Sequence, residues 1–362
     1  QKRKRDVMRD KRRRPGTEEL DHILEDFSDK SRAEKFLTDL QCSRGNTLTQ
    51  HLKTLKMVLG DEDAPIDVFL GLGVMEVLLQ HLLSGSPENQ FEAAWSISNI
   101  ASGSHENTQA AMEVAPHLIN FLKSGSPVMQ EQCAWALGNM VSDSLEFTEI
   151  LVAQGLLEAI IPVLRSSVLT TVATALWVVV HLTRRDTPAM CDALKQQGIF
   201  DLLEGFLNKD SEDIQRECVW LLSYLTSEQG HAEAVIEANV LESVVNMASA
   251  EDRDTVIGAL RTLGNLCSKP DPEFTNAVLR FQDELFPALA VILRGNSRIH
   301  TREALWVISN IAGGTLEQVD ALMESGVCPE LRRLMYEQAM DIKLEVAYCI
   351  ANLAADGRYL RD

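Results

Sequence analysis

Apolar residues recur along most of this chain at the spacing of amphipathic helices. The first clear face begins after Thr47, where leucines follow one another at intervals of four, three and four residues: Leu48, Leu52, Leu55 and Leu59. Gly60 and Pro65 then end that pattern. The rest of the chain repeats short apolar helical segments and breaks, which predicts an all-α protein.

A Gly or an Asn precedes an apolar run in most of the units that follow. These residues are Gly73, Gly155, Gly198, Asn239 and Gly326. A polar break comes after the run, as at residues 84–87 and 124–127, and leads to a longer helical segment. A short polar helix then leads to the next Gly. Each unit therefore holds three helices in roughly 42 residues, the length of armadillo or HEAT repeats.

The longer helix of each unit carries two residues spaced four apart, which we call a ladder pair. The seven ladder pairs are Trp95/Asn99, Trp135/Asn139, Trp177/His181, Trp220/Tyr224, Arg261/Asn265, Trp306/Asn310 and Tyr348/Asn352. Their first members are 40 to 45 residues apart, and they include all five tryptophans of the chain. A helical repeat of this period forms a solenoid in which each unit stacks on the next.

These patterns predict an all-α armadillo-repeat solenoid with a right-handed superhelical course and about eight three-helix repeats. One weak unit near residues 46–72 has no ladder tryptophan. We assign residues 46–362 to the solenoid, residues 17–45 to an acidic linker with a short helix, and residues 1–16 to a basic arm. Because no polar capping repeat follows the last ladder helix, we expect a shortened chain or a partner at that end.

The formal net charge of −19 is unevenly distributed. Residues 1–14 contain nine Lys or Arg and two Asp, which leaves 25 basic and 51 acidic side chains for the rest of the chain. An acidic body argues against nucleic acid as its direct partner and favours a basic partner. The charge division also allows the arm to bind the body to which it is attached.

Composition and motifs exclude several other classes. The seven cysteines form no CxxC pair or metal-like cluster, which predicts small core residues in a reducing compartment. No apolar run reaches the roughly 18 residues that span a bilayer, so membrane insertion is not expected. We interpret the GxG at residues 71–73 as a repeat turn, because no strand precedes it. No ligand spacing links His105, His117, His231 and His300, so neither an enzyme nor a cofactor is predicted.

A helical wheel of residues 91–100 separates two faces. Ala93, Ile97 and Ile100 form the core face, whereas Trp95 and Asn99 lie opposite, as on the wall of a half-exposed groove. The residues three positions before the seven ladder pairs are Glu92, Gln132, Thr174, Glu217, Gly258, Glu303 and Glu345. Four of these seven are acidic, and we call them the ladder glutamates. Stacked repeats would place these side chains along one concave surface.

These residue types predict an extended, Lys/Arg-rich peptide ligand. An Asn side chain carries donors and an acceptor, so a row of them can bind the main chain of an extended peptide. Indole rings form slots for the apolar stem of Lys or Arg, with a cation–π attraction of roughly 0.5–2 kcal/mol. Glutamates at the ends of the slots accept the charged heads. The alternative is that the tryptophans only pack between repeats; the coupled Asn counts against it, because a buried Asn needs partners.

Basic residues divide this surface. Arg261 stands where a Trp is expected, and Arg184 and Arg185 follow His181. Cations there disfavour a basic ligand. We therefore predict two peptide sites, one on the units of Trp95, Trp135 and Trp177 and another on those of Trp306 and Tyr348.

The sequence resembles the importin-α family of nuclear import adaptors over essentially its whole length. Residues 94–103 and 134–139 are close to the major-site repeats of that family, and the pairs Trp220/Tyr224 and Arg261/Asn265 reproduce its departures from Trp/Asn. The resemblance implies an adaptor that binds nuclear localisation signals of cargo proteins, links them to importin-β, and shuttles between cytoplasm and nucleus.

The resemblance also implies individual site residues. In the family, a Gly, a Thr and an Asp form a pocket for the critical lysine, and the matching positions are Gly103, Thr108 and Asp143. The implied major peptide site consists of Trp95, Asn99, Gly103, Thr108, Gln132, Trp135, Asn139, Asp143, Trp177 and Glu217. The implied minor peptide site consists of Arg261, Asn265, Glu303, Trp306, Asn310, Glu345, Tyr348 and Asn352. Part of the family's importin-β-binding segment, which is autoinhibitory when free, resembles the basic residues Lys4, Arg5, Lys11, Arg12, Arg13 and Arg14.

Some positions depart from the family pattern. His181 replaces Asn, Tyr348 replaces Trp, and Cys267 and Phe274 lie where the family has other residues lining the minor site. The first basic cluster of the importin-β-binding segment and the final, export-receptor-binding repeats have no counterpart. The alternative function is an armadillo-repeat scaffold or a divergent adaptor dedicated to one client protein. The acidic body and the ladder glutamates count against a scaffold with a basic groove.

Overall fold

The structure is a computed structural model that describes residues 27, 29–61, 63–185, 187–228, 230–337 and 339–355. The basic arm at residues 1–16, with Lys4, Arg5, Lys11, Arg12, Arg13 and Arg14, lies outside the described residues. Within the described ranges every regular element is helical. The chain divides into two compact units, residues 1–186 and 187–362, which we describe in turn.

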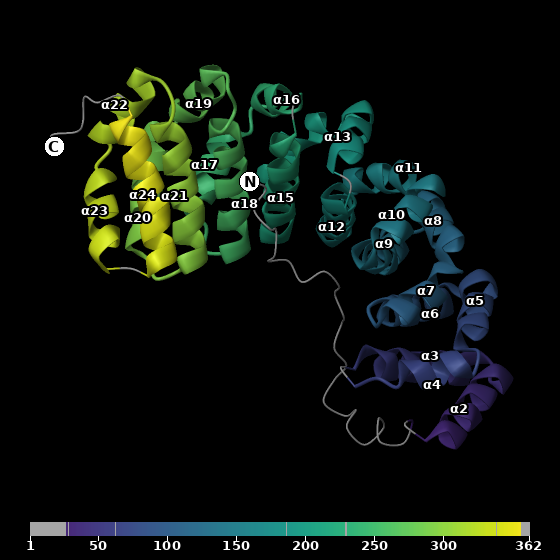
Figure 1. The fold of residues 1–362 in the computed structure, drawn as a ribbon. Helices are drawn as coiled ribbons and strands as arrows, with labels where there is room; N and C mark the ends of the chain where they lie inside the picture. Colours follow the sequence, from purple (N-terminus) through teal and green to yellow (C-terminus); the bar gives the residue numbers. More distant parts are fainter. Residues whose placement is uncertain are drawn as a thin grey trace. The chain divides into compact units, whose positions relative to one another are not determined.

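Unit 1 contains three complete three-helix repeats, preceded by a helix pair, within its described residues (Figure 1). Its elements are α2 (Lys30–Cys42), α3 (Gly45–Gly60), α4 (Ile66–Gly71), α5 (Val74–Ser84), α6 (Pro87–Ala101), α7 (His105–Met112), α8 (Ala115–Ser124), α9 (Pro127–Asp143), α10 (Leu145–Ala153), α11 (Leu156–Ile160), the 3₁₀ helix η1 (Ile161–Arg165) and α12 (Leu169–Arg185).

Unit 2 contains four three-helix repeats within its described residues. Its helices are α13 (Thr187–Gln196), α14 (Phe200–Leu207), α15 (Glu212–Ser227), α16 (Ala232–Glu237), α17 (Leu241–Met247), α18 (Arg253–Cys267), α19 (Pro272–Leu279), α20 (Gln282–Arg294), α21 (Arg298–Ala312), α22 (Leu316–Glu324), α23 (Cys328–Glu337) and α24 (Met340–Ala354).

Left-handed backbone positions separate the first and second helices of most repeats. All five residues that were predicted to open an apolar helix have positive φ: 80° at Gly73, 88° at Gly155, 72° at Gly198, 54° at Asn239 and 76° at Gly326. Gly adopts this region without steric cost, and Asn tolerates it better than most residues. The predicted polar breaks start the third helices, because Ser86 and Ser126 accept N-cap hydrogen bonds and each is followed by a Pro in the first turn.

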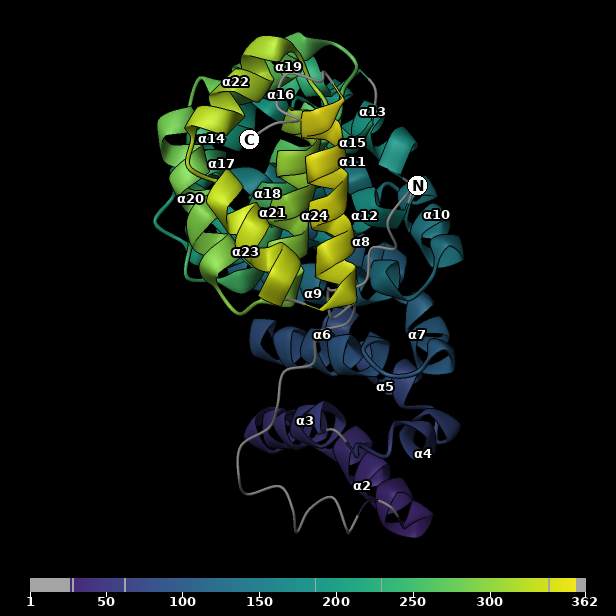
Figure 2. The ribbon, with the colours of Figure 1, turned by 60° about the vertical axis from the view of Figure 1, so that its left-hand side comes forward.

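The third helices of successive repeats contact one another and carry all the ladder pairs. In unit 1, α3 contacts α6, α6 contacts α9 and α9 contacts α12. In unit 2, the helices α15, α18, α21 and α24 lie side by side (Figures 1 and 2). Their inner faces are fully buried, with residues such as Ile97, Leu137 and Leu263. The core thus forms between repeats, as a solenoid requires.

An aromatic cluster begins the packed part of unit 1. Phe36 on α2 lies with its ring centroid 5.0 Å from that of Phe27 and 6.4 Å from that of Phe69 on α4. Leu37 and Leu40 of α2 are buried as well. The helix α2 therefore packs into the body, although it lies within residues 17–45, the range that was expected to hold an acidic linker and a short helix.

Candidate functional site

Five of the seven ladder pairs connect adjacent repeats by a hydrogen bond. In each, the Asn side chain donates through Nδ2 to a main-chain oxygen of the preceding third helix. The bonds are Asn99 to Lys56 (3.0 Å), Asn139 to Ser98 (3.1 Å), Asn265 to Ser223 (2.7 Å), Asn310 to Gly264 (2.9 Å) and Asn352 to Ser309 (2.8 Å). An Asn amide has two donors and an oxygen acceptor, so one such bond does not exhaust it. The ladder Asn is thus a structural residue in addition to a candidate peptide contact.

His181 breaks this series. Its Nδ1 lies 2.9 Å from the main-chain oxygen of Trp177, one turn earlier on the same helix, and the imidazole is buried. The substitution of Asn by His therefore replaces a bond between repeats by a bond within α12.

The slot predicted between Trp135 and Trp177 is closed. The two ring centroids are 5.4 Å apart, and the Trp177 ring is fully buried against Gly138. An aliphatic stem between two rings needs about 7–8 Å, which is twice the usual carbon–carbon contact distance. Trp177 is thus a packing residue in this conformation, and the expectation that its ring lines an open slot is corrected. Trp95 and Trp135 are only half-buried.

A lysine of the chain itself lies on Trp95. Lys56 of α3 places its Nζ 4.3 Å from the centroid of the Trp95 ring and 2.7 Å from Oε2 of Glu92. The side chains of Lys56 and Glu92 are only 17% and 6% exposed. An indole face and a carboxylate one turn apart therefore hold an ammonium group in the manner that was predicted for a ligand.

Unit 2 contains a related contact in which an arginine lies near an indole and a carboxylate. The guanidinium of Arg261 lies 5.2 Å from the Trp220 ring centroid, and its Nε and Nη2 donate to Oε1 of Glu303 at 3.3 and 3.1 Å. Arg261 was predicted to interrupt the ladder by its charge. In the structure its guanidinium group lies between an indole of α15 and a carboxylate of α21.

Each of the four ladder glutamates lies near a cation of its own chain. In addition to Glu92 and Glu303, Glu217 lies 3.7 Å from Arg216 and Glu345 lies 3.9 Å from Arg302. The prediction assigned these carboxylates to ligand heads alone and missed the internal partners. A sequence signal exists for Lys56 and Arg261, since each lies about one repeat before the acid it contacts.

The residues of the predicted lysine pocket lie on or next to three helices that contact one another, α6, α7 and α9. Gly103 follows α6, Thr108 lies on α7, and Asp143 is the last residue of α9. The hydroxyl of Thr108 lies 3.0 Å from the main-chain oxygens of both Ala101 and Ser104. Thr148 makes the equivalent contacts one repeat later, so this threonine role is partly structural.

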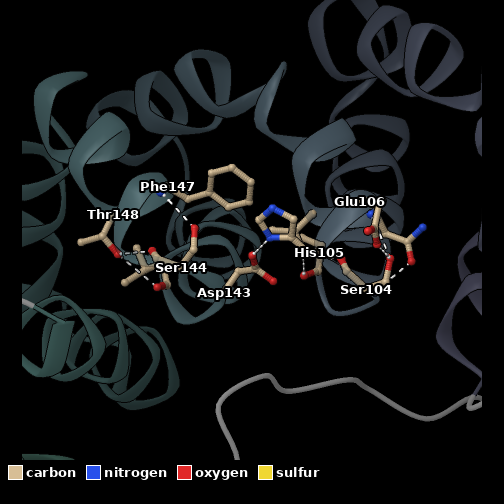
Figure 3. Close-up of polar contacts among 11 residues, drawn as sticks. Ser104, His105, Glu106, Asp143, Ser144, Phe147 and Thr148 are labelled. Atoms are coloured by element: carbon tan, nitrogen blue, oxygen red, sulfur yellow. Dashed lines mark hydrogen bonds and ion pairs between the residues drawn. The ribbon is translucent and has the colours of Figure 1, made fainter.

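His105 stands beside the acid of this pocket (Figure 3). Its Nδ1 lies 2.5 Å from Oδ2 of Asp143, whose side chain is 7% exposed, and its ring stacks on Phe147 with centroids 5.0 Å apart. The sequence analysis gave His105 no role. Because the imidazole and a ligand ammonium would approach the same carboxylate, His105 belongs to the candidate site.

Gln132 is a second buried polar group among the residues of the predicted major site. It is 1% exposed, and neither Oε1 nor Nε2 has a hydrogen-bond partner among the described residues. A buried amide without partners costs about 1–3 kcal/mol. Such a group, one turn before Trp135, favours a ligand that supplies the missing hydrogen bonds.

The predicted minor site is more open. Trp306, Asn265, Asn310 and Asn352 are half-buried, and Tyr348 is 55% exposed. Cys267 is buried and Phe274 half-buried. This surface of unit 2 therefore offers accessible Asn side chains, whereas Asn99 and Asn139 of unit 1 are buried.

Within the described ranges, no group of three or more His, Cys, Asp or Glu side chains is arranged to hold a metal ion. In that same part of the chain no single helix is long and apolar enough to cross a membrane. One bent pair of helices, Leu145–Ala153 with Leu156–Arg165, has the length and the apolar composition of a membrane span.

Comparison with known families identifies the repeat. The model of the Armadillo/beta-catenin-like repeat matches residues 62–102, 104–142, 187–227, 229–268 and 315–355, together more than half of the chain. The repeats α10–α12 and α19–α21 have the same three-helix build outside the matched ranges. The predicted all-α armadillo fold is therefore confirmed.

Sequence relatives agree with the predicted family. Importin subunit alpha-9 of Arabidopsis thaliana is 32% identical over 301 residues, which are 81% of this chain and 58% of the relative. Importin subunit alpha-2 of Oryza sativa subsp. japonica is 34% identical over 313 residues, 83% of this chain and 59% of the relative. This chain thus spans less than two thirds of the length of either relative. The predicted resemblance to importin-α is confirmed.

A solved structure shows the same architecture. An engineered protein superposes with a TM-score of 0.79 at 25% identity, over 89% of this chain and 78% of that chain.

Proposed function

The chain belongs to the armadillo-repeat family and is similar to importin-α subunits, and from this premise we propose that it is a nuclear import adaptor. It binds Lys/Arg-rich nuclear localisation signals of cargo proteins along the third helices of its repeats. It shuttles between cytoplasm and nucleus.

The contact of Lys56 with Trp95 and Glu92 carries this proposal. Its Nζ lies 4.3 Å from the ring centroid and 2.7 Å from the carboxylate. The ladder surface thus holds an ammonium group by the two interactions that a basic peptide would use. The net charge of the chain, −19, adds long-range attraction for such a peptide.

Two further groups support a peptide site on unit 1. Asp143 is a largely buried carboxylate that contacts the imidazole of His105, and a ligand ammonium can replace this contact. Gln132 is a buried amide that lacks partners among the described residues. We propose that a lysine head binds beside Asp143, with Gly103 and Thr108, and that the peptide main chain approaches Gln132, Asn99 and Asn139.

We propose that the basic arm has two partners. Its residues Lys4, Arg5, Lys11, Arg12, Arg13 and Arg14 bind importin-β in the import complex. In the absence of importin-β the arm occupies the acidic peptide site and acts as an autoinhibitor, because it carries the charge pattern of a ligand.

Titration of a labelled, lysine-rich signal peptide tests the site. We expect Asp143→Lys to weaken binding by well over tenfold, because an ion partner becomes a repulsion. Glu158→Lys is the matched control, since it changes the charge equally on an exposed position of α11. Equal affinities for the parent chain and Asp143→Lys, or equal losses in both variants, would refute the site assignment.

Removal of residues 1–16 tests the arm. We expect the shortened chain to bind the signal peptide more tightly and to lose binding of importin-β. The difference in peptide affinity should shrink at high salt, because the arm and the peptide compete electrostatically. Identical peptide affinities with and without the arm would exclude autoinhibition.

One observation favours the second candidate function, a divergent adaptor dedicated to one client protein. Trp177 leaves no open slot between its ring and that of Trp135. A dedicated client needs fewer slots than a general cargo receptor. Signal peptides of unrelated sequence distinguish the two, because only a general receptor binds several of them with similar affinity.

A further inference from the structure

Lys56 contacts three residues of the neighbouring helix α6: Glu92 and both members of the ladder pair Trp95/Asn99. Its main-chain oxygen accepts a hydrogen bond from Nδ2 of Asn99 at 3.0 Å. Its Nζ lies 2.7 Å from Glu92 and 4.3 Å from the ring centroid of Trp95. One residue thus engages the acid, the indole and the amide that together form one peptide subsite.

The neighbouring ion pair on the same two helices differs in its surroundings. Lys53 of α3 contacts Glu88 of α6 at 2.7 Å, but these side chains are 39% and 58% exposed and no ring lies beneath the ammonium group in the described contacts. Lys53–Glu88 is an ordinary surface pair. Lys56 is the more buried cation, and it alone of the two covers a ladder tryptophan.

The Lys56 ammonium group on the face of the Trp95 ring limits which peptide side chains can bind there. A second ammonium group would meet the Lys56 charge at short range, and Glu92 already has a partner. The subsite on the α3 side of Trp95 therefore disfavours Lys and Arg and accepts uncharged or acidic side chains. In unit 2, Arg261 also contacts an indole and a carboxylate of the chain, but there Trp220 and Glu303 lie on two different helices, α15 and α21.

We propose that Lys56 is a specificity-determining residue that ends the basic subsites of unit 1 at Trp95. The proposal rests on the proposed function as a receptor for basic peptides. It assigns the α3 end of the site to a peptide residue that is not Lys or Arg. A purely structural Lys56 would join α3 to α6 without any effect on peptide selectivity.

Three labelled peptides test the proposal. One has a core of five basic residues with Ala on both sides, and the others add two Lys at the amino or the carboxyl end. We expect neither extension to improve the affinity of the parent chain by more than about twofold. In Lys56→Met, which keeps the apolar stem and removes the charge, one of the two extensions should improve the affinity at least fivefold relative to the core peptide.

Lys53→Met is the matched control, because it makes the same charge change one turn away on the exposed pair. For Lys53→Met, the affinity of each extended peptide relative to the core peptide should equal that measured with the parent chain. Equal ratios in Lys56→Met and the parent would overturn the proposal. Failure of the parent chain to bind the core peptide would instead refute the proposed function.

A measurement on the parent chain covers the case that Lys56→Met does not fold. Peptides with two Glu at the amino or the carboxyl end are compared with their two-Lys counterparts, and at one end only the Glu peptide should bind at least threefold more tightly, since Lys56 attracts the acid. The same preference at the other end of the peptide, or a preference for Lys at both ends, would contradict the proposal.

Discussion

The indole ring of Trp306 lies against the backbone of Gly264, one repeat earlier, where no side chain fits. A β-carbon on Gly264 would collide with the six-membered part of the ring. The main-chain oxygen of the same glycine accepts the hydrogen bond from Asn310. One residue of α18 thus receives both members of the ladder pair of α21, and in unit 1 the ring of Trp177 packs on Gly138 in the same way.

Gly264→Ala should therefore destabilise the protein. Overpacking of a filled contact costs about 1–3 kcal/mol. Gly205 on α14 is the matched control, because a β-carbon there meets no atom within 4 Å, and Ala in a helix is favoured over Gly by up to about 1 kcal/mol. Urea unfolding followed by circular dichroism should show opposite shifts for the two variants. A shift in the same direction for both would mean that the ring moves aside at little cost.

The ladder Asn should contribute to stability without any ligand. Asn310→Ala removes one of two hydrogen bonds to the main-chain oxygen of Gly264, which keeps the bond from the Ser268 amide, so the expected loss is that of one hydrogen bond, about 0.5–1.5 kcal/mol. Asn246→Ala, on an exposed position of α17, should stay within about 0.5 kcal/mol of the parent. Peptide affinities of ladder variants must therefore be compared at matched folded fractions. Equal stability of the two variants would show that water replaces the donor.

The repeat could be predicted from the sequence, because its signals are local. The positive φ at Gly73 and Asn239 and the cap at Ser86 depend on neighbouring residues alone. The internal cations could not be predicted in this way. Whether Lys56 reaches Trp95 depends on how α3 and α6 stack, which local periodicity does not specify.

Trp177 illustrates the same limit. Its helical position is equivalent to those of Trp95 and Trp135, yet its ring is buried against Gly138 while theirs are half-buried. The available signal is the glycine that directly precedes Asn139, since it leaves room for a ring of the next repeat. His105 was missed for a related reason: its contact with Asp143 joins residues 38 apart that begin and end different helices.

Acid should weaken the junction of α20 and α23. Hydrogen bonds from Arg294 and Arg333 hold the pKa of the Glu330 carboxyl below its usual range. The folded state therefore binds fewer protons than the unfolded state. The stabilisation is complete above the unfolded pKa, about 4.3, and is lost as the pH falls through the lower folded value.

Glu330→Gln should lower the melting temperature at pH 7 by an amount that corresponds to about 1 kcal/mol or less, because Arg294 is largely exposed. At pH 3 the variant and the parent should differ much less. Glu324→Gln, on an exposed position of α22, should have no effect at either pH. A difference that persists undiminished at pH 3 would show that the carboxylate charge is not its source.

Thiol reactivity should follow burial. Burial raises the pKa of the Cys267 and Cys349 thiols to about 12 and raises that of Cys133 and Cys218 as well, so these groups supply very little of the reactive thiolate at neutral pH. Cys42 is exposed. A thiol reagent should modify Cys42 first, and Cys42→Ser should remove the fast phase. Fast modification of Cys133 in the folded protein would contradict the packing of α9.

The contact between His105 and Asp143 leads to the last prediction, which rests on the proposed peptide site. A ligand ammonium that binds Asp143 must displace the imidazole, whose Nδ1 lies 2.5 Å from the carboxylate and whose ring is held on Phe147. Removal of this competitor should therefore strengthen peptide binding. We expect His105→Ala to tighten the complex with a lysine-rich peptide by about two- to tenfold, which corresponds to one lost hydrogen bond of about 0.5–1.5 kcal/mol. His117→Ala on α8 serves as the control and should leave the affinity unchanged. Calorimetric titration that shows weaker binding for His105→Ala would mean that the imidazole orients Asp143 for the ligand instead of competing with it.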